Sequence, residues 1–99
     1  MKIYTDEAKK IEIERDSLDL GEVPAGESRQ FTFYVENDSQ AYLRELKFEV
    51  NHDEVTIVKS PQTLNANETV KLIVEWSPSI NLKEGLHTSV DIEGKEVWS

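Results

Sequence analysis

The histidines and the acidic residues are the side chains in this sequence that could hold a metal ion. The two histidines, His52 and His87, lie 35 residues apart and lack the close spacing of zinc ligands on one element. Calcium requires several oxygen ligands. The acidic cluster at 16–22 and the pair Asp53-Glu54 do not follow the D-x-D-x-D-G rhythm of a calcium loop. We therefore expect no metal site and no cofactor.

Covalent and phosphate chemistry also lack a local signature. No serine lies in a G-x-S-x-G nucleophile turn, and the four glycines, at 21, 26, 85 and 94, are too isolated for a phosphate-binding loop. The sequence has no cysteine, which excludes thiol catalysis, thiolate metal ligands and disulfides. We expect that this protein is not an enzyme.

Several aromatic side chains could contact a ligand or a partner. They are Tyr4, Tyr34, Tyr42 in a polar stretch, and Trp98 next to the last residue. Aromatic rings offer a large apolar area, with a polar tip in Tyr and Trp, which suits a sugar-binding platform or a protein contact. The alternative is that each of them covers an edge of the folded domain.

The N-terminal segment is a second candidate contact. Met1, Ile3 and Tyr4 are apolar, and the chain turns polar immediately afterwards. We interpret this segment as an arm that docks on a neighbouring protein through these anchors, with Tyr42 and Trp98 as further partner-binding residues. The alternative is a frayed terminus or an extra edge strand on the domain's own sheet.

Apolar and polar residues alternate over most of the chain, which is the pattern of half-buried strands. The clearest alternation is at Phe31–Val35, Leu46–Val50, Val70–Trp76 and Leu86–Ile92, and the shorter candidates are Ile11–Ile13, Leu18–Val23, Val55–Val58 and Lys95–Trp98. Helical spacing appears nowhere at a length that could hold a helix. We place Trp76 in the core, with neighbours that include Phe33, Phe48 and Val90.

Turn residues separate these strands at intervals of about 8–12 residues, as in β-sandwiches. We predict a three-residue hairpin at Pro24-Ala25-Gly26, with Gly26 in the left-handed conformation. Asn65 or Asn67 can adopt the same conformation. We also predict that Asn81–Gly85 is the longest loop and that Glu93-Gly94-Lys95 is a tight turn. Seven or eight short strands without a helix indicate an all-β fold, a β-sandwich of two antiparallel sheets.

The segment LDLGEVPAGE, residues 18–27, resembles the opening of Ig-like domains of the hydin and abnormal-spindle type. Four later segments also resemble this family: Phe31–Asn37, Leu64–Thr69, Val74–Pro78 and Gly85–Ile92. The sequence departs from the family at Asn65-Ala66-Asn67, which lacks the family's Pro-Gly pair. Major sperm protein and chaperone-type sandwiches have a similar pattern. The resemblance covers about residues 17–98 and implies an Ig-like β-sandwich that serves as a non-catalytic module in a large assembly.

Length and charge indicate one domain and limit its partners. We assign residues 1–16 to an N-terminal arm that can contribute a first strand, and residues 17–99 to the Ig-like β-sandwich domain. The net charge of −9 disfavours nucleic acid and anionic membranes as partners. No stretch approaches the ~20 apolar residues of a membrane span, and the N-terminus lacks the apolar region of a secretory signal.

We interpret the chain as a non-catalytic structural or interaction module that binds a protein partner in a larger assembly. Small acidic Ig-like proteins of this kind resemble decoration or head–tail accessory subunits of bacteriophage particles. This predicts a location in the virion, or in the cytoplasm before assembly. Two alternatives stay open: a scaffold domain excised from a longer cytoplasmic or ciliary protein, and a carbohydrate-binding module that uses Tyr34, Tyr42 or Trp98.

Overall fold

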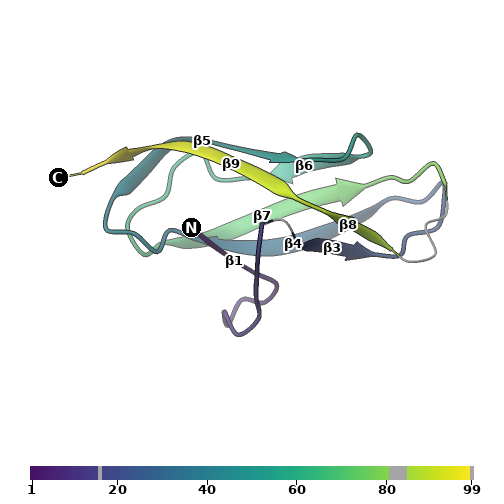
Figure 1. Ribbon diagram of the computed structural model, residues 1–99, viewed down its shortest axis with the longest axis horizontal. Helices are drawn as coiled ribbons and strands as arrows, with labels where there is room; N and C mark the ends of the chain where they lie inside the picture. The colour runs from purple at the N-terminus through teal and green to yellow at the C-terminus, as the bar shows by residue number, and fades with distance from the viewer. Residues whose placement is uncertain (16, 81–84, 99) are drawn as a thin grey trace.

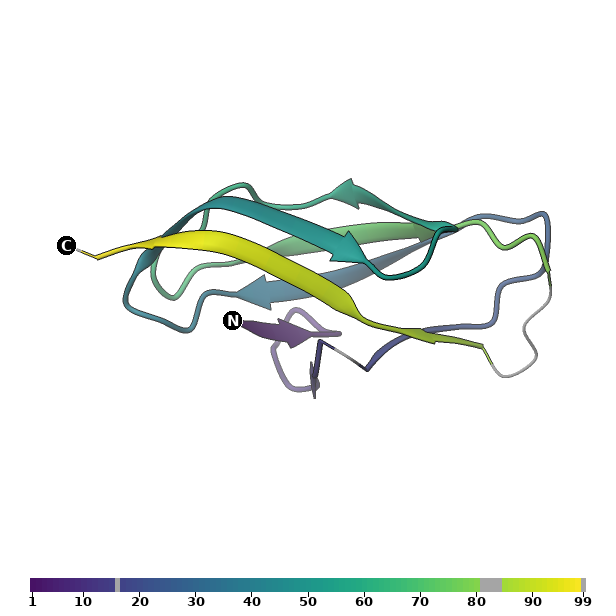
Figure 2. The same cartoon turned by 45° about the horizontal axis from the view of Figure 1, so that its top comes forward.

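The computed structural model describes residues 1–15, 17–80 and 85–98, and these ranges form antiparallel strands without a helix. The strands are β1 (Lys2–Tyr4), β2 (Glu12–Ile13), β3 (Leu18–Gly21), β4 (Arg29–Glu36), β5 (Tyr42–Val50), β6 (Val55–Lys59), β7 (Thr69–Trp76), β8 (Leu86–Thr88) and β9 (Val90–Val97). They lie in two facing layers (Figure 1, Figure 2). The predicted all-β sandwich is confirmed.

The larger layer is a five-stranded sheet in the order β2-β1-β4-β7-β6. Its centre is the β4–β7 pair, which stays in register over the whole of β4, from Arg29 to Glu36. Successive side chains of a strand point to opposite faces. Phe33 and Val35 therefore point into the sandwich and are buried, as predicted, whereas Thr32 is exposed on the outer face.

The facing layer is held together by one nearly continuous run of chain, β8 followed by β9. β8 pairs with β3 and β9 pairs with β5, and only Ser89 separates β8 from β9. The other edge of β5 is covered by the segment before β7. There the backbones of Leu43 and Leu64 bond in both directions, and the Leu46 N–H donates to the Gln62 carbonyl at 3.0 Å. The second layer is narrower than the five-stranded sheet that it faces.

The core fills the space between the layers with apolar side chains from both. Trp76 on β7 is fully buried, at 0% exposure. Its cluster includes two of the predicted neighbours, Phe33 and Val90, and the third, Phe48, is partly buried against it. The phase predicted for the main strands is therefore correct.

The last strand is longer than the sequence predicts. We expected a tight turn at Glu93-Gly94-Lys95, but β9 continues through these residues to Val97. The prediction was wrong because Gly94 has a packing role instead. It lies opposite a bulge in β5, and a Cβ on Gly94 would lie 2.6 Å from Leu46 Cδ2. Glycine at this position leaves room for the buried Leu46 side chain.

The turn after β3 has the predicted glycine conformation but does not close a hairpin. Gly26 has a φ of +85°, and the Glu27 N–H donates to the Pro24 carbonyl at 3.1 Å, as in a type II β-turn. However, β3 pairs with β8 while β4 pairs with β1 and β7, so the turn carries the chain from one layer to the other. The hairpin prediction was wrong because turn chemistry does not decide which strands pair. In the separate turn at residues 65–68, Asn67 is left-handed (φ +63°), as predicted for one of its two asparagines.

The N-terminal residues are part of the folded domain. β1 lies between β2 and β4 in the larger sheet, and Ile3 is paired with Val35 and only 1% exposed. Tyr4 is buried as well. The expectation of a free docking arm gives way to the alternative of an added strand on the domain's own sheet. Residue 16, at the predicted boundary, and residues 81–84 of the predicted longest loop lie outside the described residues.

The burial of Trp76 predicts a large loss of stability when its side chain is removed. Trp76→Ala should lower the free energy of unfolding by about 3–5 kcal/mol, because it leaves a cavity in a packed core. The indole N–H is buried without a hydrogen-bond partner among the described residues. Trp76→Phe should therefore cost less. Urea unfolding of the three proteins measures both values, and a Trp76→Ala midpoint close to that of the original chain would contradict this packing.

The turn geometry predicts different costs at two adjacent exposed positions. Gly26→Val forces a β-branched residue into a positive φ and should cost about 1 kcal/mol or more. A Cβ on Gly26 would meet no atom within 4 Å, so the cost comes from the backbone and not from a clash. Ala25→Val is the matched control and should cost less. Equal shifts in the thermal midpoint would contradict the left-handed conformation.

Candidate functional site

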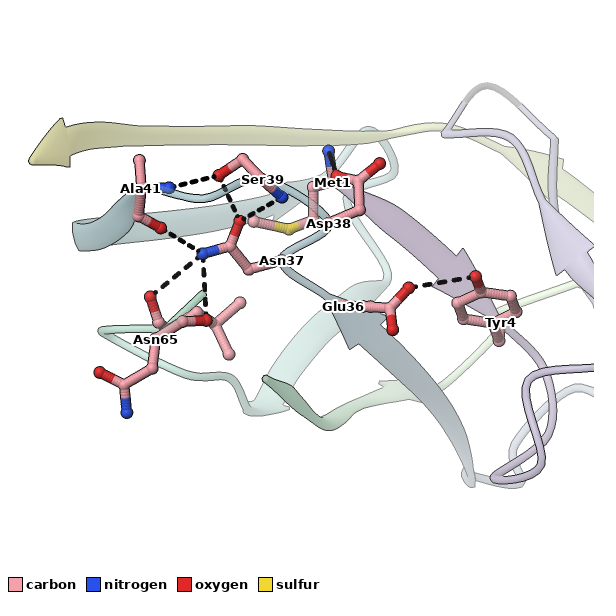
Figure 3. Close-up of polar contacts among 9 residues, drawn as sticks. Met1, Tyr4, Glu36, Asn37, Asp38, Ser39, Ala41 and Asn65 are labelled. Atoms are coloured by element: carbon pink, nitrogen blue, oxygen red, sulfur yellow. Dashed lines mark hydrogen bonds and ion pairs between the residues drawn. The ribbon is translucent and has the colours of Figure 1, made fainter. Parts of the chain in front are cut away.

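Asn37, directly after β4, is a buried polar residue that shapes the loop between β4 and β5 (Figure 3). Its Nδ2 donates to the carbonyls of Ala41 at 2.7 Å, Asn65 at 3.1 Å and Leu64 at 3.3 Å. Its Oδ1 accepts bonds from the N–H and the hydroxyl of Ser39. One amide thus joins this loop to the segment before β7. Since a buried polar group is stable only when its bonds are made, these contacts hold the loop in one shape.

The chain's N-terminus rests on the same loop. The Met1 ammonium pairs with Asp38 Oδ1 at 3.0 Å (Figure 3). The hydrogen bond and the positive charge of the ammonium hold the pKa of Asp38 below its usual value. The stability that this pair contributes is therefore present above the normal carboxyl pKa and lost as the pH falls through the lowered one. Because the pair is partly exposed, its main effect is to position Met1.

Tyr4 and Tyr34 are paired on β1 and β4, on the face of the sheet opposite to Ile3. Glu36 connects this face to the loop between β1 and β2. It accepts a bond from the Tyr4 hydroxyl at 3.3 Å, and its other oxygen is 2.7 Å from Lys9 Nζ. Burial and the nearby carboxylate raise the pKa of Tyr4, while the Lys9 ammonium lowers the pKa of Glu36. The Tyr4 ring is thus used within the domain.

Tyr42 and Trp98 both lie at the end of the second layer, where β5 begins and β9 ends. Tyr42 lies opposite Val97, and Trp98 is the next residue along the chain. Their exposures are 38% for Tyr42, 41% for Val97 and 63% for Trp98. The indole N–H of Trp98 donates to Glu96 Oε2 at 3.2 Å, which places the ring on the side of Glu96, the face opposite to that of Tyr42 and Val97. We call Tyr42, Val97 and Trp98 the end patch.

The five residues predicted to bind a partner therefore lie in different surroundings. Ile3 and Tyr4 are buried in the domain, and Met1 is half-buried beside the loop after β4. Tyr42 and Trp98 are exposed and close in the strand register, and their role in partner binding stays a prediction. The four aromatic residues proposed as a sugar platform are divided between two places, so they do not form one surface.

The histidines and grooves of the described residues suggest no reaction. His52 Nδ1 accepts a bond from the Glu54 N–H at 3.1 Å, within a turn, and His87 is exposed on β8. An open groove of about 800 Å³ runs beside the β5 bulge, and the charged side chains that line it are Arg44, Glu45, Lys47, Glu93 and Lys95. In residues 1–15, 17–80 and 85–98 no group of His, Asp and Glu side chains is arranged to hold a metal ion.

Two facing antiparallel layers, with a chain that crosses between them after β3, define an immunoglobulin-like β-sandwich. The model of the HYDIN/CFA65/VesB-like Ig-like domain matches residues 9–96. The chain belongs to this family of Ig-like domains, which are generally non-catalytic modules. The hydin-type resemblance is thus confirmed, and the match includes part of the segment that we assigned to the arm.

No curated protein and no solved structure matches the chain significantly. Within the described residues there is no helix long and apolar enough to cross a membrane.

The Asn37 contacts predict that this side chain stabilises the fold and the loop before Tyr42. Asn37→Ala removes all the side-chain bonds of Asn37, including the donor to the Ala41 carbonyl, while the Leu64 and Asn65 carbonyls keep a backbone donor. It should lower the free energy of unfolding by about 2–4 kcal/mol. Asn51→Ala is the matched control. It removes one exposed bond, from Asn51 Nδ2 to Ser89 Oγ, and should change stability by less than about 1 kcal/mol. Chemical unfolding of both variants measures the difference, and similar values would contradict the role given to Asn37.

Proposed function

We propose that the chain is an interaction module that binds a protein partner through the end patch. The observation that supports this most strongly is the exposure of three large side chains at one end of the β5–β9 pair, with Tyr42 and Val97 on one face and Trp98 on the other. Tyrosine and tryptophan are enriched among the residues that supply most of the energy of protein interfaces. Exposed apolar side chains on both faces of one strand end offer a partner two neighbouring contact points.

Tyr42 is well suited to binding because it is held in place before a partner binds. Tyr42 follows Ala41, whose carbonyl accepts a bond from Asn37, and it lies on a strand paired with β9. Side chains that are ordered before binding lose little conformational entropy on association. A partner would therefore gain most of the contact energy of the Tyr42 ring.

Charge gives the expected chemistry of the partner surface. The chain carries a net charge of −9, Glu96 bonds the Trp98 indole, and Asp38 lies in the loop that leads to Tyr42. A partner with an apolar centre and a basic or neutral rim would be complementary, whereas an acidic rim would be repelled.

The assembly that we propose is a virus particle, with the chain as a decoration or head–tail accessory subunit, present in the virion or in the cytoplasm before assembly. The support is that this chain, as a small acidic Ig-like protein, resembles such subunits of bacteriophage particles. The family match favours a second candidate equally, a scaffold domain of a longer cytoplasmic or ciliary protein. Both candidates use the same property, which is binding to a protein partner.

The proposal predicts that end-patch variants fold normally and fail to assemble. Tyr42→Ala and Trp98→Ala should each lower incorporation of the chain into its native assembly by roughly tenfold or more, as expected for interface hot spots. Their far-ultraviolet circular dichroism should be unchanged. Quantitative mass spectrometry of the purified assembly measures incorporation.

The matched control is Ile80→Ala, because Ile80 is as exposed as Trp98, at 63%, and lies outside the end patch. It should be incorporated normally. Equal incorporation of all variants would contradict the proposal. Specific binding of the chain to a glycan array, lost in Trp98→Ala, would favour the carbohydrate-binding alternative.

A further inference from the structure

The outer edge of β9 is open along its middle. The Val90 N–H points away from β5 and donates to the Arg15 carbonyl at 2.8 Å, while the Ser89 carbonyl points towards β5 and accepts from Asn51. Backbone groups alternate in direction along a strand. The N–H and carbonyl groups of Ile92, Gly94 and Glu96 therefore point outwards, and they have no hydrogen-bond partner among the described residues.

This edge is already used for strand pairing within the chain. β3 occupies it along β8, and Arg15 occupies it at Val90. Beyond Val90 nothing in the described residues continues this pairing, although β9 runs on to Val97 and is exposed from Glu93 onwards. The open part of the edge is thus a ready position for one more strand.

The edge strands of the larger sheet are less suitable for pairing. β2 has only two residues. β6 is interrupted by a bulge between Ile57 and Lys59, directly before Pro61. Bulges, proline, short length and charged side chains are features by which proteins protect edge strands. β9 carries charged side chains but is eight residues long, has no proline and stays regular, since the bulge of the β5–β9 pair lies on β5.

We propose that two copies of the chain pair through this edge, β9 against β9 in antiparallel direction, about a two-fold axis at Gly94. In this register Ile92 lies opposite Glu96 of the second copy, and Gly94 lies opposite Gly94 of the second copy. The open positions of both copies are then used completely, with about six backbone hydrogen bonds. The interface adjoins the end patch but uses the backbone edge of β9 and neither the Tyr42 nor the Trp98 side chain, so it goes beyond the proposed function and does not depend on it.

Charge selects the same register. Glu93 and Lys95 lie between the residues whose backbone N–H and carbonyl groups point outwards, and their side chains are exposed. Pairing about Gly94 places Glu93 opposite Lys95 of the other copy twice, in the close, non-hydrogen-bonded positions. A shift of the axis to Glu93 or Lys95 would place two like charges opposite each other. The net charge of −9 on each copy opposes association, so screening by salt should favour the dimer.

Disulfide trapping tests the register, because the chain has no cysteine of its own. In the proposed dimer the Cα atoms of residue 93 and of residue 95 in the other copy are about 4.5 Å apart, within disulfide range. An equimolar mixture of Glu93→Cys and Lys95→Cys should form a mixed disulfide dimer under mild oxidation. Each variant alone should form little, since like positions lie about 7 Å apart or more. Lys71 is exposed on β7 in the other layer. Mixing Lys71→Cys with Glu93→Cys or with Lys95→Cys therefore measures the disulfide formed by random collision.

Charge exchange tests the energetics by sedimentation equilibrium over a range of protein concentrations. Lys95→Glu places like charges opposite each other twice and should weaken dimerisation by roughly tenfold or more. The double variant Glu93→Lys/Lys95→Glu restores opposite charges and should restore the dimer. Lys71→Glu changes the net charge equally and should have a small effect, and Tyr42→Ala should have none. A chain that stays monomeric at all concentrations, or trapping no faster than with Lys71→Cys, would overturn the proposal.

Discussion

The second layer of this sandwich depends on one run of chain, β8 and β9. The run pairs with β3 at one end and with β5 at the other, and so it holds both of these strands over the apolar face of the larger sheet. Phe33, Leu72 and Val74 of that sheet are buried by this arrangement. β9 has β5 as its partner strand on one edge. Its opposite edge, on the side where β3 pairs with β8, stays open where β3 does not reach.

Asn37 gives the second constraint, at the end of the sandwich away from β3. Besides its side-chain bonds, its backbone N–H donates to Glu68 at 2.9 Å and its carbonyl accepts from Asn67 at 2.7 Å. The left-handed conformation of Asn67 belongs to the same turn. Local order at this end therefore comes from polar contacts between the two layers' loops, and it fixes the strand on which the end patch lies.

Much of the fold is predictable because each main strand has a simple alternation of polar and apolar residues. Phe33, Leu72 and Trp76 were placed correctly by this pattern alone. The errors occur where a residue's role depends on a distant neighbour. Gly94 resembles a turn residue, but it is required by Leu46 on another strand, and Ile3 resembles a free anchor, but it pairs with Val35. Val97 was missed because its position opposite Tyr42 exists only if β9 is unbroken.

The central claim is that, among the described residues, the middle of β9 has an open edge that suits pairing with another strand. Amide hydrogen exchange of the chain at low concentration, read residue by residue by nuclear magnetic resonance, tests it most directly. The amides of Asp91, Glu93 and Lys95, which point towards β5, should exchange slowly, and those of Ile92, Gly94 and Glu96 should exchange fast. Protection of all six amides in the monomer would mean that the chain covers this edge itself and would contradict the account.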